Sequence, residues 1–103
     1  MYESLTKFLS RTDGIEYEFA DAVNDFVLAH PDFDLRNYKA ILSEHNITSP
    51  KVDVSSFDGK LVMTVIVAIV RTDRFHEGLL KRCIEDGRIE KCLLRLKELD
   101  GGD

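Results

Sequence analysis

The stretch LVMTVIVAIV, residues 61–70, decides the fold of this chain, because Thr64 is its one polar residue. A segment that is apolar on every side needs other elements packed around it. The run is too short to cross a bilayer, since a membrane-spanning helix takes about 20 apolar residues. We therefore expect it to form the centre of a globular core.

Two structures compete for this run. A β-hairpin is favoured by the alternation over residues 52–57, by the turn dipeptide Asp58-Gly59 and by the valines and isoleucines that follow. A helix is favoured by the length of the run and by Ser55 and Asp58, whose spacing resembles a capping box. An isolated hairpin in a helical protein would also leave strand edges to cover. We predict a helix from about Ser56 to Arg71 and keep the hairpin as the alternative.

Apolar residues recur at helical spacing through the first half of the chain and predict three helices. The first is short and holds Tyr2, Leu5, Phe8 and Leu9, with Asp13-Gly14 as its stop. The second carries the stripe Phe19, Ala22, Val23, Phe26, Val27 and His30, and Pro31 ends it. The third contains Tyr38, Ile41, Leu42 and His45. We expect Asp34 to cap its start and Asn46 to close it in a left-handed turn, with Ile47 folded back.

Two further stripes follow the central run. They are Phe75, Leu79, Leu80, Cys83 and Ile84, and then Ile89, Cys92, Leu93, Leu96 and Leu99. Gly87 suits a left-handed helix end between them, so we predict a C-terminal helical hairpin. The fold class is therefore all-α. We expect one compact domain over residues 1–103, with five or six helices around the central apolar helix at about 56–71.

Charge and cysteine content limit which partners and which cellular compartment the sequence suits. The net charge is −5, with nine acids and four bases in residues 1–50 and ten of each in residues 51–103. Because neither half is basic, a non-specific grip on nucleic acid is not indicated. The first residues lack the basic start and apolar core of a secretory signal, so we expect a cytoplasmic protein that is not in a membrane. There Cys83 and Cys92 should be reduced core residues, with a redox pair as the alternative.

Charged side chains crowd together where the apolar run ends, and this cluster is the candidate site: Arg71, Asp73, Arg74, His76 and Glu77. Such a cluster suits an anion or a general acid–base pair. The structural alternative is that Asp73 caps the next helix, and that Glu77 pairs with Lys81 one turn on. The three histidines lie in different elements without metal-ligand spacing, so we predict no metal and no cofactor.

The string from Ile69 to Leu80 resembles one in a family of small, uncharacterised bacterial helical domains of unknown function. Glu85 to Ile89, followed by Arg95 to Leu99, is similar as well, so the resemblance covers roughly residues 56–99. It implies a helical domain in a soluble bacterial protein. It carries no activity, cofactor or functional residue over to this chain.

The sequence supports three hypotheses of function. The first is a non-enzymatic protein-interaction or self-associating helical module, because apolar residues such as Phe33 and Leu94 lie off the main stripes. The second is a small-ligand binder or enzyme that uses the Arg71–Glu77 cluster. The third is a DNA-binding domain with Arg88–Lys97 as recognition helix, although the interleaved acids there are typical of a solvated face.

Overall fold

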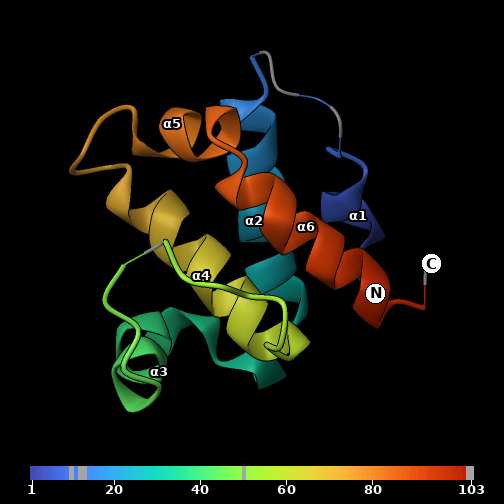
Figure 1. Cartoon of the computed structure of the whole chain (residues 1–103), viewed down its shortest axis with the longest axis vertical. Helices are drawn as coiled ribbons and strands as arrows, with labels where there is room; N and C mark the ends of the chain where they lie inside the picture. Colours follow the sequence, from blue (N-terminus) through green and yellow to red (C-terminus); the bar gives the residue numbers. More distant parts are fainter. Residues whose placement is uncertain (10, 12–13, 50, 102–103) are drawn as a thin grey trace.

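The apolar run forms a helix, α4 (Gly59–Thr72), which lies at the centre of the computed structural model (Figure 1). The structure describes residues 1–9, 11, 14–49 and 51–101. The backbone of Asp58 is extended, and its Oδ1 accepts a hydrogen bond from the Leu61 amide at 2.8 Å. Asp58 is therefore the N-cap itself, so the hairpin alternative is wrong.

The start predicted at Ser56, with a capping box from Ser55, is also wrong. The Ser55 amide donates instead to Asp53 Oδ1 at 2.9 Å, which holds residues 53–56 in a turn. This local hydrogen bond competes with helix formation, so the helix begins three residues later than predicted.

The described residues form six α-helices and two 3₁₀ turns with loops between them, and they contain no strand. The predicted all-α fold is confirmed. In chain order the elements are α1 (Glu3–Thr6), α2 (Glu16–Ala29), η1 (Pro31–Phe33), η2 (Leu35–Asn37), α3 (Tyr38–Glu44), α4 (Gly59–Thr72), α5 (Leu79–Glu85) and α6 (Arg88–Leu99). None of these helices is both long and apolar enough to cross a lipid bilayer.

Helix α4 is central because α2, α3, α5 and α6 all pack against it. Val62, Met63 and Ile66 are completely buried. Thr64 is buried as well, but its hydroxyl donates to the Lys60 carbonyl at 2.7 Å, so it leaves no unpaired polar group in the core. The predicted placement of α4 among the other amphipathic helices is confirmed.

The chain between α2 and α4 departs from the prediction at one end of α3. Asp34 does not cap an α-helix. It has a left-handed backbone with φ of 55°, and its carboxylate accepts from Asn37 Nδ2 at 3.0 Å. The 3₁₀ turn η2 follows, and α3 begins only at Tyr38. At the other end Asn46 is left-handed and the Ile47 amide donates to the Leu42 carbonyl at 2.9 Å, as predicted.

Three predictions for ring-bearing side chains of this region have different outcomes. The His30 ring stacks on Phe26 with centroids 4.2 Å apart, so His30 is a packing residue as expected. Phe33 also packs on Phe26 and is not a surplus surface residue. His45 is exposed at the end of α3, which corrects its predicted place on a buried stripe.

The start of α5 was predicted too early. Residues 73–78 form a turn, and Phe75 is 86% exposed. The helix begins at Leu79, where Asp73 Oδ1 accepts from the Leu80 amide at 3.0 Å across the turn. Glu77 is thus outside the helix, so the predicted helical pair with Lys81 is wrong. Gly87 is left-handed between α5 and α6, which pack together.

The first turn of the chain is tied to the end of α6. Asp100 accepts from the Tyr2 amide at 2.8 Å and from the Met1 ammonium at 3.0 Å. Tyr2, Leu5 and Phe8 are buried, as the helical spacing predicted. Asp13, part of the predicted stop of this element, lies outside the described residues.

Candidate functional site

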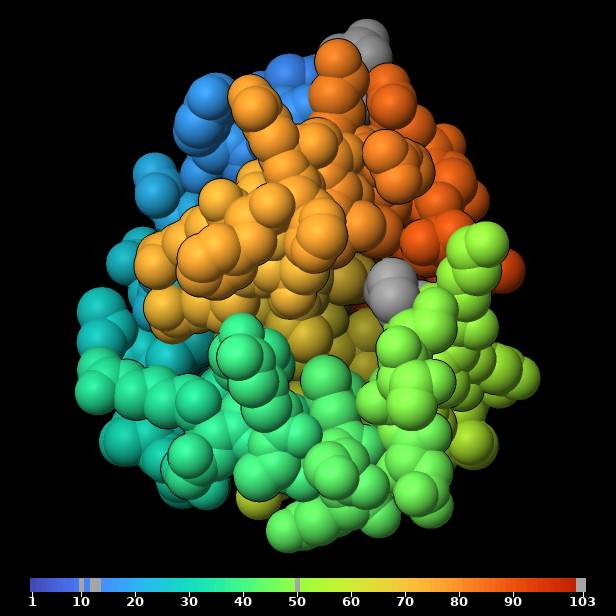
Figure 2. Space-filling view, turned by 90° about the vertical axis from the view of Figure 1, so that its left-hand side faces the viewer, coloured from blue at the N-terminus to red at the C-terminus, as the bar shows by residue number. Residues whose placement is uncertain are grey.

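One side of the molecule is hollowed along α4. Figure 2 shows α4 at the bottom of a depression between α3 with its following loop and the segment leading into α5. Two adjoining hollows lie here. The apolar cleft, of about 230 Å³, is lined mainly by Leu42, Ile47, Val65, Ala68, Ile69 and Leu79. The arginine groove, of about 370 Å³, is lined by Arg36, Tyr38, Arg71, Arg74 and Phe75.

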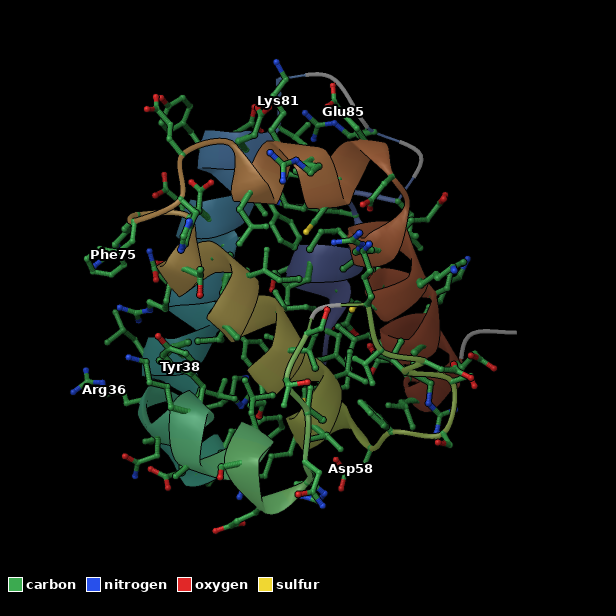
Figure 3. All side chains as sticks on the ribbon, turned by 60° about the vertical axis from the view of Figure 1, so that its left-hand side comes forward. Arg36, Tyr38, Asp58, Phe75, Lys81 and Glu85 are labelled. Carbon is green, nitrogen blue, oxygen red and sulfur yellow. The ribbon has the colours of Figure 1, made fainter. Side chains whose placement is uncertain are left out.

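Three elements bring the arginines together. Arg71 is on the last turn of α4, and Arg74 and Phe75 follow in the turn before α5. Arg36 belongs to η2, which packs on α4. The left-handed Asp34 sets the chain direction into η2 and so places Arg36 beside the end of α4. Arg36, Tyr38 and Phe75 lie along one edge of the molecule in Figure 3.

The arginine groove is electrostatically unbalanced. The ion pairs of the described residues are Met1 with Glu3 and Asp100, Arg11 with Glu18, and Arg88 with Asp86. Within that part of the chain, no carboxylate lies within 4.0 Å of the guanidiniums of the groove. Guanidinium groups stay charged at all relevant pH values. A local positive site therefore exists on a chain whose net charge is −5.

Two aromatic rings accompany these charges. Phe75 is 86% exposed, so its ring is available to a ligand. Tyr38 is half-buried and packs against the core. Flat apolar surface beside guanidinium groups suits a ligand that carries both negative charge and apolar or planar groups.

The five residues of the predicted cluster have separate places in the structure. Arg71 and Arg74 lie together in the arginine groove. Asp73 is half-buried and its carboxylate holds the start of α5. His76 and Glu77 are exposed in the turn and line neither of the two hollows.

Sequence reasoning missed Arg36 and Tyr38. They are separated from Arg71 by more than thirty residues, and no spacing rule connects the two segments. The exposed Phe75 was missed because it fits the stripe of α5 when the turn before α5 is read as helix. The one available signal was Gly78, which has a left-handed backbone and separates Phe75 from the helix.

The other candidates of the sequence are scaffold residues in the structure. Cys83 and Cys92 are buried, and burial raises the pKa of the Cys92 thiol to about 12. Burial also raises the pKa of Cys83, although Arg88 Nη1 lies 3.9 Å from its sulfur. Burial therefore disfavours the reactive thiolate form of both cysteines. Across the described ranges, no three His, Cys, Asp or Glu side chains gather in the way that a metal ion requires.

Helix α6, the proposed recognition helix, uses two of its basic residues internally. Arg88 pairs with Asp86 at 3.0 Å, and Arg95 Nε donates to the Phe57 carbonyl at 2.8 Å. The exposed Lys91 and Lys97 alternate with Glu90 and Glu98. This arrangement gives α6 a mixed surface rather than a basic one.

The chain belongs to a family of unknown function, DUF6508, which matches residues 6–101. The match is longer than the resemblance over residues 56–99 and includes all the residues of both hollows. Neither a curated protein nor a solved structure matches the chain.

Proposed function

We propose that this member of the DUF6508 family is a non-enzymatic protein-interaction module that binds an acidic segment of a partner. The observation that carries this proposal is the arginine groove, in which three guanidiniums lie beside the exposed ring of Phe75. In the described part of the chain these guanidiniums have no carboxylate partner. Arginine binds carboxylates strongly, through two parallel hydrogen bonds.

The apolar cleft continues the arginine groove. Ala68 of the cleft and Arg71 of the groove are three residues apart and so neighbour each other on α4, and Thr72 of the cleft follows Arg71 directly in the chain. Tyr38 and Leu42 are likewise one turn apart on α3. A single bound segment can therefore place acidic side chains on the arginines and an apolar side chain in the cleft.

Magnitudes show that both hollows are needed. An exposed ion pair contributes about 0–1 kcal/mol, so three arginines alone give weak binding. Burying one leucine-sized side chain adds about 1.5–3 kcal/mol. Micromolar affinity takes about 8 kcal/mol, so we expect transient binding that depends on the cleft and on Phe75 as well as on charge.

The lining favours binding over acid–base catalysis. It consists of guanidiniums, one phenol, the hydroxyl-bearing residues Thr48, Ser49 and Thr72, and apolar groups. A guanidinium stays protonated near neutral pH, so it is poorly suited there to act as a general acid or base. The residues with titratable side chains in the predicted cluster, Asp73, His76 and Glu77, are outside the two hollows.

A labelled peptide tests the proposal. The peptide carries glutamates on both sides of a leucine, and a glutamine version of it serves as the uncharged comparison. Fluorescence anisotropy should show binding of the acidic peptide that weakens at least about tenfold when Arg71→Gln and Arg74→Gln are combined, since charge-assisted contacts are lost.

The matched control removes two positive charges elsewhere, through Lys91→Gln and Lys97→Gln on α6. It should change the affinity less than about twofold, as expected for distant exposed charges in salt. If both double variants weaken binding equally, the peptide responds to net charge alone and the proposal is wrong.

A second candidate function is binding of a small anion that carries a planar ring. The arginine groove favours it because Tyr38 and Phe75 flank the guanidiniums, and its 370 Å³ lies within the usual size of ligand sites. ATP is a suitable probe. An increase in Tm with ATP that Arg71→Gln abolishes, together with displacement of the acidic peptide, would favour this candidate.

A further inference from the structure

The outward face of α2 is acidic at its centre and apolar at its ends. Tyr17, Asp21, Asp25 and Leu28 follow one another at intervals of three or four residues, so they form one row on the helix. Tyr17 is 87% exposed and Leu28 is 67% exposed. We call this row the acidic face of α2.

The carboxylates at the centre of the acidic face are available to a partner. Asp21 and Asp25 are exposed and have no ion-pair partner within the described residues. The nearby Glu18 contacts Arg11 at 3.6 Å, and both of these side chains are exposed. The row thus carries unpaired carboxylates between two exposed apolar side chains, and such charges suit contact with a surface of the opposite sign.

The acidic face matches the arginine groove and the apolar cleft in charge and in chemistry. Its carboxylates would face the guanidiniums, while one of its apolar ends would enter the cleft. A cavity of about 150 Å³ holds a benzene ring, so the cleft of about 230 Å³ has room for such a side chain. The row is roughly 16 Å long at 1.5 Å per residue, about half of the 34 Å extent of the molecule.

We infer that the acidic segment bound at the groove is α2 of a second copy of this chain. This inference rests on the proposed function, because it uses the same arginine groove and names the partner. The two surfaces meet at one end, where Leu28 and Arg36 line the same hollow, and α2 runs along one edge of the view in which the hollows face the reader (Figure 2). Because the contact joins the groove of one copy to α2 of another, a head-to-tail arrangement leaves one groove and one α2 available on each added copy.

Sedimentation of two charge-reversed variants tests the inference. The groove variant combines Arg71→Glu with Arg74→Glu, and the α2 variant combines Asp21→Lys with Asp25→Lys. The wild type should gain mass between micromolar and millimolar concentration, while each variant alone stays monomeric. An equimolar mixture of the two should regain association, because the α2 of the groove variant still fits the groove of the α2 variant and the two reversed surfaces also carry opposite charges.

A control variant combines Glu90→Lys with Glu98→Lys on the exposed side of α6, which gives the same change in net charge as the α2 variant. It should associate as the wild type does. Circular dichroism establishes that every variant keeps its helical content before its mass is compared.

Three results would overturn the inference: a wild type that is monomeric at millimolar concentration, a mixture that stays monomeric, or a groove variant that associates like the wild type. The acidic peptide separates these failures from failure of the proposed function. If the wild type is monomeric but still binds the peptide through Arg71 and Arg74, the groove serves an outside partner. If the peptide does not bind either, both proposals fall.

Discussion

At the residue scale, single carboxylates determine where elements begin and meet. Asp58 caps α4, Asp73 holds the start of α5 across a turn, and Asp100 joins the first residues to the end of α6. Each accepts a backbone amide that would otherwise lack a partner. These aspartates have structural roles. Asp73 is therefore not part of the candidate site, although it lies between Arg71 and Arg74 in the sequence.

Replacing Asp73 by alanine should lower the free energy of unfolding by about 1 kcal/mol, the usual effect of losing a capping side chain. Asp73→Asn keeps an oxygen that accepts the Leu80 amide and should recover most of this loss. Urea unfolding of both variants measures it. Equal stability of Asp73→Ala and the wild type would show that the cap does not contribute.

Asp100 gives stability a defined dependence on pH. Burial tends to raise its pKa, but the Tyr2 amide and the Met1 ammonium outweigh this and hold the pKa below the usual value. A carboxyl group with a lowered pKa stabilises the fold above its unfolded-state value of about 3.9, and this contribution is lost as the pH falls through the folded-state pKa.

The difference in unfolding free energy between wild type and Asp100→Asn should therefore be complete at neutral pH and shrink in acid below about pH 4. Urea titrations at a series of pH values provide the measurement. A difference that stays constant down to the lowest pH would contradict the role of the Asp100 charge.

At the scale of elements, periodicity located the helices with regular apolar stripes but not all of their ends. The stripes of α2 and α6 and the burial of α4 followed directly from spacing. The start of α4 depended on whether Ser55 or Asp58 would act as the cap. The start of α5 depended on a hydrogen bond from Leu80 to Asp73, seven residues away, which no helical spacing rule contains.

Because α4 is surrounded by four helices, Ile66→Asp should abolish folding, since an unpaired buried charge costs several kcal/mol. Lys60→Asp puts the same side chain on the exposed first turn of the same helix and should have little effect. Circular dichroism melting compares the two. An Ile66→Asp variant that melts like the wild type would show that α4 is not the centre of the fold.

At the scale of the whole molecule, the candidate site exists only after folding. The sequence indicated Arg71 and Arg74, because they crowd together after the apolar run. Arg36 and Tyr38 join them through the packing of η2 and α3 on α4, a contact between distant segments that a single sequence does not encode locally. The apolar cleft likewise forms only where α3, α4 and α5 meet.

If the residues of the arginine groove bind together as one site, Arg36→Gln should weaken binding of the acidic peptide about as much as Arg71→Gln does. Losing one exposed charge contact removes about 0–1 kcal/mol of binding free energy, so each variant should weaken binding by up to about fivefold. Anisotropy titrations of the two single variants measure this. An Arg36→Gln variant that binds like the wild type would remove η2 from the site.

The most direct test of the central claim, that the arginine groove binds an acidic segment, is a ¹⁵N NMR titration with the acidic peptide. The side-chain Nε–H signals of Arg36, Arg71 and Arg74 and the amide of Phe75 should shift together and saturate. Those of Arg88 and Arg95, which are already engaged with Asp86 and Phe57, should stay in place. Shifts confined to residues outside the groove, or uniform small shifts of every arginine, would contradict the claim.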